Sequence, residues 1–163
     1  YPEILLDFFG VKYNKQKYNI NYPKEKEENL IGIEENVGVM RPIKRWKKYR
    51  ELYEKLKENN FNVRIFNKEE SIEKYIKEIS KCKIVVCSDT AAVHLGIALN
   101  KKVISILGPT PTHEIERYDN VIQIQANNCK HFLEYECIEK DCCLDTISVD
   151  KVIDEIKKLM EKI

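Results

Sequence analysis

The sequence lacks a long apolar run and an excess of charge of either sign. No stretch approaches the roughly 20 apolar residues that a membrane-spanning helix needs, and no signal-peptide pattern opens the chain. Lysine and arginine together number 28 against 27 acidic residues, which leaves a formal net charge of +1. That balance gives no electrostatic footprint for nucleic acid or for an anionic membrane. We therefore expect a cytoplasmic protein without a nucleic-acid partner.

The sequence also lacks internal repeats and low-complexity tracts, so the spacing of its apolar residues is the main guide to its strands and helices. Short apolar runs alternate with amphipathic stretches from residue 30 onward. Strands separated by helices of this length indicate right-handed crossovers and an α/β fold with a Rossmann-like, doubly wound, mostly parallel sheet. The pattern predicts strands at 30–33, 61–66, 83–87, 103–107 and 121–124, and helices at 45–59, 71–80, 90–99 and 149–163.

Residues 1–29 do not follow this rhythm. Ile4, Leu5, Phe8 and Phe9 predict a short apolar helix that ends at Gly10, and a connector rich in lysine, asparagine and tyrosine follows. We expect residues 1–29 to be a connector between domains and residues 30–163 to be one domain. The apolar face of the connector helix also predicts weak self-association, as a homodimer.

Two strand ends carry residues suited to ligand binding. In a doubly wound sheet, ligands lie beyond the carboxyl ends of the strands, where helix N-termini present free N–H groups. One strand leads into Ser88-Asp89-Thr90-Ala91-Ala92-Val93-His94, and the next leads into Gly108-Pro109-Thr110. Ser88 or Asp89 can cap the following helix, and small residues in its first turn let an anion approach the backbone. Spacing alone fits a capped helix with a core histidine equally well.

The two segments together resemble the donor-site signature of the heptosyltransferase family, the ninth family of glycosyltransferases. In that family an Asp-(Ser/Thr)-Gly at a strand end is followed by histidine, a small-residue helix, a strand and a Gly-Pro-Thr turn. Residues 88–110 match in order, spacing and context, except that Ala91 stands where the family commonly has glycine. The segment Val39 to Trp46 resembles the family's loop that ends in Lys-x-Trp. By that match Lys44 meets the donor diphosphate as a flexible point charge; the alternative is a solvated lysine.

Four cysteines crowd into one polar stretch before the last helix, where many family members carry a cysteine-bearing loop. They are Cys129, Cys137, Cys142 and Cys143, with Phe132 where a further cysteine often stands. Their spacing is not the paired C-x₂-C pattern of a strong zinc site. We favour free thiols or one disulfide over zinc, and a surface role for His131. Cys82 and Cys87 flank an apolar run and are expected to be buried thiols.

The resemblance implies the carboxyl-terminal half of a two-lobed, GT-B type glycosyltransferase. Such an enzyme transfers a sugar from a nucleotide diphosphate to a hydroxyl acceptor with inversion, without a cofactor or an obligatory metal. The partners implied are a nucleotide-diphosphate sugar and a saccharide or lipid-linked saccharide acceptor. The expected substrate-binding residues are Met40, Arg41, Lys44, Asp89, Thr90, Ala91, His94, Gly108 and Thr110.

The resemblance assigns no catalytic base to this chain, because in the family that base comes from the amino-terminal acceptor lobe. The stretch between Phe66 and Ser71 is also shorter than in family members, which usually have an extra loop, helix and strand there. That difference leaves a second interpretation, a non-catalytic nucleotide-sugar-binding module. A zinc-stabilised interaction domain is a third interpretation, favoured only by the cysteines.

Overall fold

The computed structural model describes residues 8–10, 12, 18–23, 25–39, 41–67, 71–116, 118–129 and 142–161. Within them, a five-stranded sheet has the order β2–β1–β3–β4–β5, with every neighbouring pair parallel. The strands are β1 (Ile31–Glu34), β2 (Val63–Ile65), β3 (Ile84–Ser88), β4 (Lys102–Leu107) and β5 (Val121–Gln125). The helices are α2 (Tyr49–Glu58), α3 (Ile72–Lys81), α4 (Ala91–Ala98) and α5 (Val149–Glu161), with short 3₁₀ turns η1 (Pro42–Lys44), η2 (Thr112–Glu114) and η3 (Cys143–Thr146). The predicted α/β fold class is confirmed.

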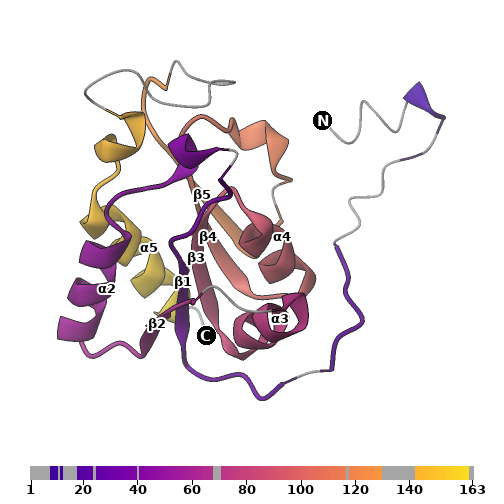
Figure 1. Cartoon of the computed structure of the whole chain (residues 1–163), viewed down its shortest axis with the longest axis horizontal. Coiled ribbons are helices and arrows are strands. Elements are labelled where there is room, and N and C mark those ends of the chain that lie inside the picture. The colour runs from indigo at the N-terminus through magenta and orange to yellow at the C-terminus, as the bar shows by residue number, and fades with distance from the viewer. Residues whose placement is uncertain are drawn as a thin grey trace.

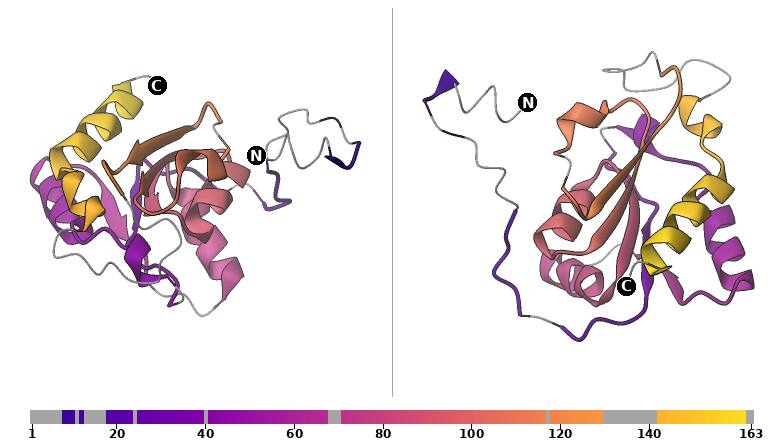
Figure 2. Two further views of the ribbon diagram at one scale, coloured as in Figure 1. Left: turned by 90° about the horizontal axis from the view of Figure 1, so that it is seen from above. Right: turned by 180° about the vertical axis from the view of Figure 1, so that it is seen from behind.

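Helices cover both faces of the sheet, with α2 and α5 on one side and α3 and α4 on the other (Figures 1 and 2). Alternate residues of strand β3 contribute to the apolar cores on the two faces of the sheet. Ile84 and Val86 pack in the core beneath α2 and α5, while Val85 and Cys87 pack beneath α3 and α4. Because each face of a central parallel strand is buried, the strand reads as a continuous apolar run rather than as an alternating one.

Asparagine residues end two of the helices, and a glycine allows one helix to pack closely on the sheet. Asn60 and Asn100 follow α2 and α4 with φ angles of 60° and 56°, the left-handed conformation that closes a helix. Gly96 lets α4 approach the sheet, because a Cβ there would lie 2.7 Å from Val103 Cγ2. The helical spacing of Ile72 from Ile76 and Ile79 predicts that it shares their apolar face, but Ile72 is 54% exposed. It is the first residue of the helix and lies at the carboxyl edge of the sheet.

The segment before β1 runs along the outside of the layer formed by α3 and α4 (Figure 1). Glu28 donates its backbone N–H to Lys81 O at 2.8 Å, and the buried Lys101 donates to Glu27 Oε2 at 2.7 Å. Phe8 and Phe9 are 83% and 68% exposed, while Ile4 and Leu5 lie outside the described residues. The boundary predicted between residues 29 and 30 stays a prediction. Across the described ranges, no helix has the length and apolar character needed to span a membrane.

The connections reverse direction between β1 and β3. From β1 the chain crosses over α2 to β2 at the edge, and from there over α3 to β3 on the other side of β1. Two crossovers that depart to opposite sides leave a crevice beyond the carboxyl ends of the two strands, which is where open α/β sheets bind ligands. Glu34 ends β1 and Ser88 ends β3, so this crevice is the place to search for a site.

Candidate functional site

Three side chains from three separate loops meet beyond the carboxyl ends of the strands. The Asp89 carboxylate forms an ion pair with Lys44 Nζ and accepts a hydrogen bond from Thr110 Oγ1 at 2.8 Å. The side chains of Lys44 and Asp89 are 18% and 15% exposed, and Thr110 is buried. Asp89 therefore connects the loop after β1, the end of β3 and the loop after β4. The structure brings together three of the residues that the sequence nominated.

A buried tryptophan fixes the loop that carries Lys44. Trp46 is fully buried, its ring packs edge-on against Tyr49 at a centroid distance of 5.2 Å, and its Nε1 donates to Ile147 O at 3.3 Å. Lys48 strengthens the same junction by donating to Ile147 O at 3.1 Å and to Asp145 O at 2.7 Å. Because these hydrogen bonds attach the loop to η3, they fix the position of the backbone that carries Lys44.

Helix α4 begins at the same edge, and its cap differs from the prediction. Thr90 is the N-cap residue, and its Oγ1 accepts from Ala92 N at 3.3 Å. The expectation that Ser88 or Asp89 caps this helix is wrong. Ser88 is instead fully buried and shares a 2.8 Å hydrogen bond with Tyr49 Oη, while Asp89 is held by Lys44 and Thr110. Burial raises the pKa of Tyr49 well above its ordinary value, so its phenol stays neutral.

A pocket of about 620 Å³ adjoins this cluster between β1 and the starts of α3 and α4. Glu34 is buried at its base, where its carboxylate accepts hydrogen bonds from Tyr75 Oη and from Asn36 N. Burial and the neighbouring Glu34 carboxylate raise the pKa of Tyr75, so the phenol remains a donor. The other lining residues are Asn36, Val37, Gly38, Val39, Asn67, Ser71, Ile72, Thr90 and Ala91.

Sequence reasoning missed the Glu34–Tyr75 pair and the exposed Ile72. One signal was available for Glu34, because it directly follows a buried strand at the switch point. Thr90 and Ala91 were predicted and do line the pocket. With the ion pair at one side, this crevice offers a cation and a helix N-terminus next to a mainly apolar cavity. That combination suits a ligand with an anionic part and a flat or apolar part.

The four remaining predicted site residues differ in where they lie. His94 is exposed on α4, where its ring lies 5.6 Å from that of Tyr18, and it does not line the pocket. Gly108 has a packing role, since a Cβ there would lie 2.7 Å from Leu144 Cγ. Arg41 is partly buried at the start of η1, and its N–H donates to Gly38 O at 3.0 Å. Met40 lies outside the described residues.

The cysteines fall into two groups. Cys82 and Cys87 are fully buried, as predicted, and burial raises the pKa of Cys82 to about 12. Cys129 and Cys142 are buried and Cys143 is partly exposed. Among the described residues, no three His, Cys, Asp or Glu side chains gather as metal ligands. Cys137, His131 and Phe132 lie outside those residues, so the preference for free thiols or one disulfide over zinc stays a prediction.

Comparison with known sequences agrees with the family resemblance. The model of the family described as Glycosyltransferase family 9 (heptosyltransferase) matches residues 68–145. The lipooligosaccharide heptosyltransferase 2 of Campylobacter jejuni serotype O:6 is 27% identical over 117 residues. That match takes in 67% of this chain and 36% of the relative, so the chain spans little more than a third of it.

Solved structures agree on the fold. The Escherichia coli heptosyltransferase WaaC with ADP superposes with a TM-score of 0.64 at 19% identity, over 96% of this chain and 54% of that chain. The same enzyme with ADP-2-deoxy-2-fluoro heptose gives a TM-score of 0.62 at 17% identity, over 96% and 53%. This chain, with its five-stranded parallel sheet, thus has the fold of about half of a GT-B heptosyltransferase structure. The resemblance predicted from the sequence is confirmed.

Proposed function

This chain is a relative of the glycosyltransferase family 9 heptosyltransferases, and we propose that it binds a nucleotide-diphosphate sugar as the donor lobe of such an enzyme. The observation that carries the proposal is the Lys44–Asp89–Thr110 cluster beside the start of α4. A diphosphate at this point meets the partial positive charge of the helix N-terminus and one lysine. The same groups can stabilise the charge of a diphosphate leaving group during sugar transfer.

The adjoining pocket fits the nucleoside part of the donor. Ile72 and Val39 supply apolar surface, and Glu34 and Asn67 supply polar groups that can pair with ribose hydroxyls or base amines. The pocket and the ion-pair cluster lie at the ends of neighbouring strands, which suits a ligand that joins a nucleoside to a diphosphate. Because WaaC was solved with ADP and with an ADP sugar, we take ADP as the first nucleotide and a heptose as the first sugar to test.

We further propose that transfer inverts the anomeric centre and that the acceptor is a saccharide or a lipid-linked saccharide. The name of the Campylobacter relative motivates that acceptor class. Acceptor binding and the general base are assigned to a second lobe, as in the two-lobed fold. The groups of this chain that we expect to meet the donor are Lys44, Thr90 and Ala91, with Arg41 and Met40 by family match. Asp89 and Thr110 hold Lys44 in place, whereas His94 lies outside the pocket and Gly108 packs against Leu144.

The test is a thermal-shift titration with ADP. Binding to the folded state alone stabilises it by about 2.7 kcal/mol at a hundredfold excess over Kd. Lys44→Ala is expected to reduce the shift strongly and His94→Ala to reduce it less, because His94 lies outside the pocket. Lys47→Ala is the matched control, an exposed lysine three residues along the same loop. If both site variants bind ADP like the parent chain, the site assignment is wrong.

A further inference from the structure

Strand β2 is the edge of the sheet, and one side of it has no described strand beside it. Ile31 donates to Asn62 O and Phe66 donates to Ile33 O, both at 2.9 Å, which fixes the side of β2 that pairs with β1. Backbone groups of a parallel ladder alternate in direction. The N–H and C=O groups of Val63 and Ile65 therefore point away from β1. A row of such groups is a template for another extended segment.

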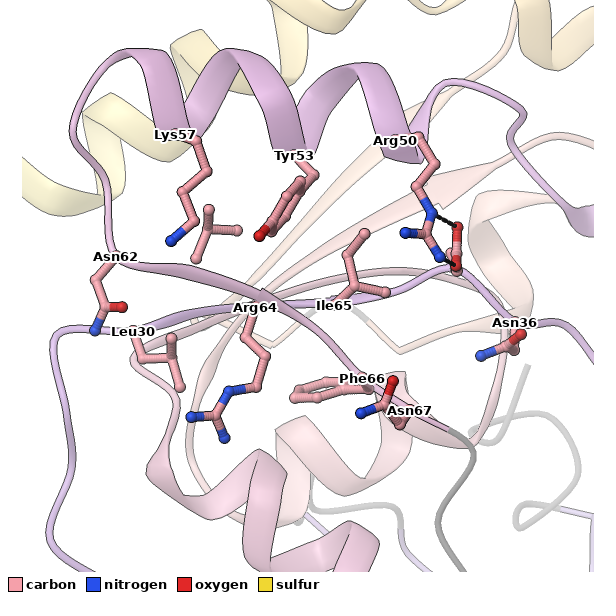
Figure 3. A pocket seen from close by; sticks show the side chains of 12 residues that line it. Leu30, Asn36, Arg50, Tyr53, Lys57, Asn62, Arg64, Ile65, Phe66 and Asn67 are labelled. Atoms are coloured by element: carbon pink, nitrogen blue, oxygen red, sulfur yellow. Dashed lines mark hydrogen bonds and ion pairs between the residues drawn. The ribbon is translucent and has the colours of Figure 1, made fainter.

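A groove follows this edge. It has a volume of about 650 Å³ and is bounded by side chains of α2 on one flank and of β2 on the other. Figure 3 shows Arg50, Tyr53 and Lys57 descending from α2 towards the strand, while Arg64 points to the opposite flank. The groove meets the nucleotide pocket at Asn36 and Asn67, which line both.

The charged side chains that line the groove are three cations, Arg50, Lys57 and Arg64, and one acid, Glu35. On the α2 flank, Glu35 is the acid for two cations, Arg50 and Arg45, the latter at 3.7 Å. Lys57 extends the same flank, with its Nζ 5.9 Å from the centroid of the Tyr53 ring.

On the β2 flank, Arg64 shares its acid with a second cation that lies outside the groove lining. Glu78 pairs with Arg64 and, at 2.6 Å, with Lys81. An occupant that carries carboxylates on both of its faces therefore meets Lys57 on one side and Arg64 on the other.

We propose that the β2 edge binds an extended acidic peptide segment of a partner, which adds as a strand beside Val63 and Ile65. Its backbone pairs with the outward N–H and C=O groups, and its successive side chains point alternately to the two flanks. Acidic side chains on one face meet Lys57, and those on the other face meet Arg64. The outward backbone groups of β2, beside which no described strand lies, define an extended occupant, and the cations of the groove lining define an acidic one.

The probe is a blocked heptapeptide with the sequence Thr-Glu-Glu-Thr-Glu-Glu-Thr, which places glutamates on both faces of a strand. Calorimetry should give an affinity about tenfold higher than for the same peptide with lysine in place of glutamate. N-methylation of two consecutive central residues should lower the affinity about tenfold, because one of the two must face β2. Hydrogen exchange at Val63 and Ile65 should slow when the parent peptide binds.

Two variants separate backbone pairing from general attraction of charge. Ile65→Pro removes an outward N–H without touching the β1 ladder, a change that edge strands tolerate, and it should weaken binding. Arg64→Glu should weaken it as well, whereas Lys47→Glu, outside the groove, should not. ADP-induced stabilisation checks that each variant is folded. The proposal is refuted if the peptide does not bind at millimolar concentration, or if the N-methylated peptide binds as well as the parent.

Discussion

Asp89→Asn should tighten the binding of ADP rather than weaken it. In the structure the candidate phosphate-binding lysine is already paired, because Lys44 Nζ contacts Asp89 Oδ2. An incoming diphosphate must share this lysine with the carboxylate or displace it. Asparagine removes the competing charge but retains an oxygen that can accept the 2.8 Å hydrogen bond from Thr110 Oγ1. The connection between position 89 and the loop after β4 therefore survives while Lys44 is released for the ligand.

The magnitude follows from how exposed the pair is. Two unit charges about 4 Å apart interact by about 4 kcal/mol at an effective dielectric of ~20, but by only about 1 kcal/mol in water. The side chains of Lys44 and Asp89 are 18% and 15% exposed, so water still reaches both. Exposed ion pairs contribute about 0–1 kcal/mol. We expect a gain near the upper end, which is about fivefold in the Kd for ADP.

A double-mutant cycle measured by calorimetry tests this reasoning. The four proteins are the parent chain, Asp89→Asn, Lys44→Ala and the double variant, each titrated with ADP at low and high salt. The gain from Asp89→Asn should vanish in the Lys44→Ala background and shrink at high salt. Weaker ADP binding by Asp89→Asn, or an equal gain without Lys44, would refute the idea that Asp89 competes for the lysine.

Two further predictions concern packing and thiol chemistry. Gly108→Ala should destabilise the chain by about 1–3 kcal/mol through the contact with Leu144, while Gly38→Ala, which has open space around it, should leave the melting temperature within a degree or two. Normal ADP affinity of Gly108→Ala would support packing as its role, and an unchanged melting temperature would contradict it. Iodoacetamide at pH 8 should spare Cys82 in the folded chain and label it after unfolding, because burial and a raised pKa of about 12 keep it a thiol. An unfolded thiol ionises at a lower pH than buried Cys82 does. Cys82 therefore contributes to the stability of the folded state below about pH 9, and this contribution is lost as the pH rises toward 12. Rapid labelling of Cys82 in the folded chain at pH 8 would contradict its burial.

The strands could be predicted because burial on both faces leaves a continuous apolar run, as Ile84 to Cys87 show. The helix ends could be predicted because Asn60 and Asn100 adopt a conformation that few other residues accept. Both signals are local: each depends on a residue and its immediate neighbours in the sequence.

The pairing inside the site could not be predicted in the same way. Tyr75 meets Glu34 across 41 residues of sequence, and Asp89 takes Lys44 and Thr110 where a helix cap was expected. A strand end determines which residues reach the edge of the sheet. The partner of each side chain there depends on how separate loops approach one another, which a linear pattern does not encode.

The last prediction is that residues 1–163 bind ADP-heptose but do not transfer the sugar. Inverting transfer needs a base near the acceptor hydroxyl and an acceptor held in line, and positioning accounts for about 7–11 kcal/mol of the barrier reduction. The two carboxylates at the candidate site each already accept two protein donors: Tyr75 and Asn36 N on Glu34, and Lys44 and Thr110 on Asp89. Both are therefore engaged in holding the site together.

Incubation with ADP-heptose and saccharide acceptors should release ADP no faster with acceptor than without it. Acceptor-dependent release above about 1 per second, an ordinary enzyme rate, would show that these residues contain a complete active site and would overturn the assignment of the base to a second lobe.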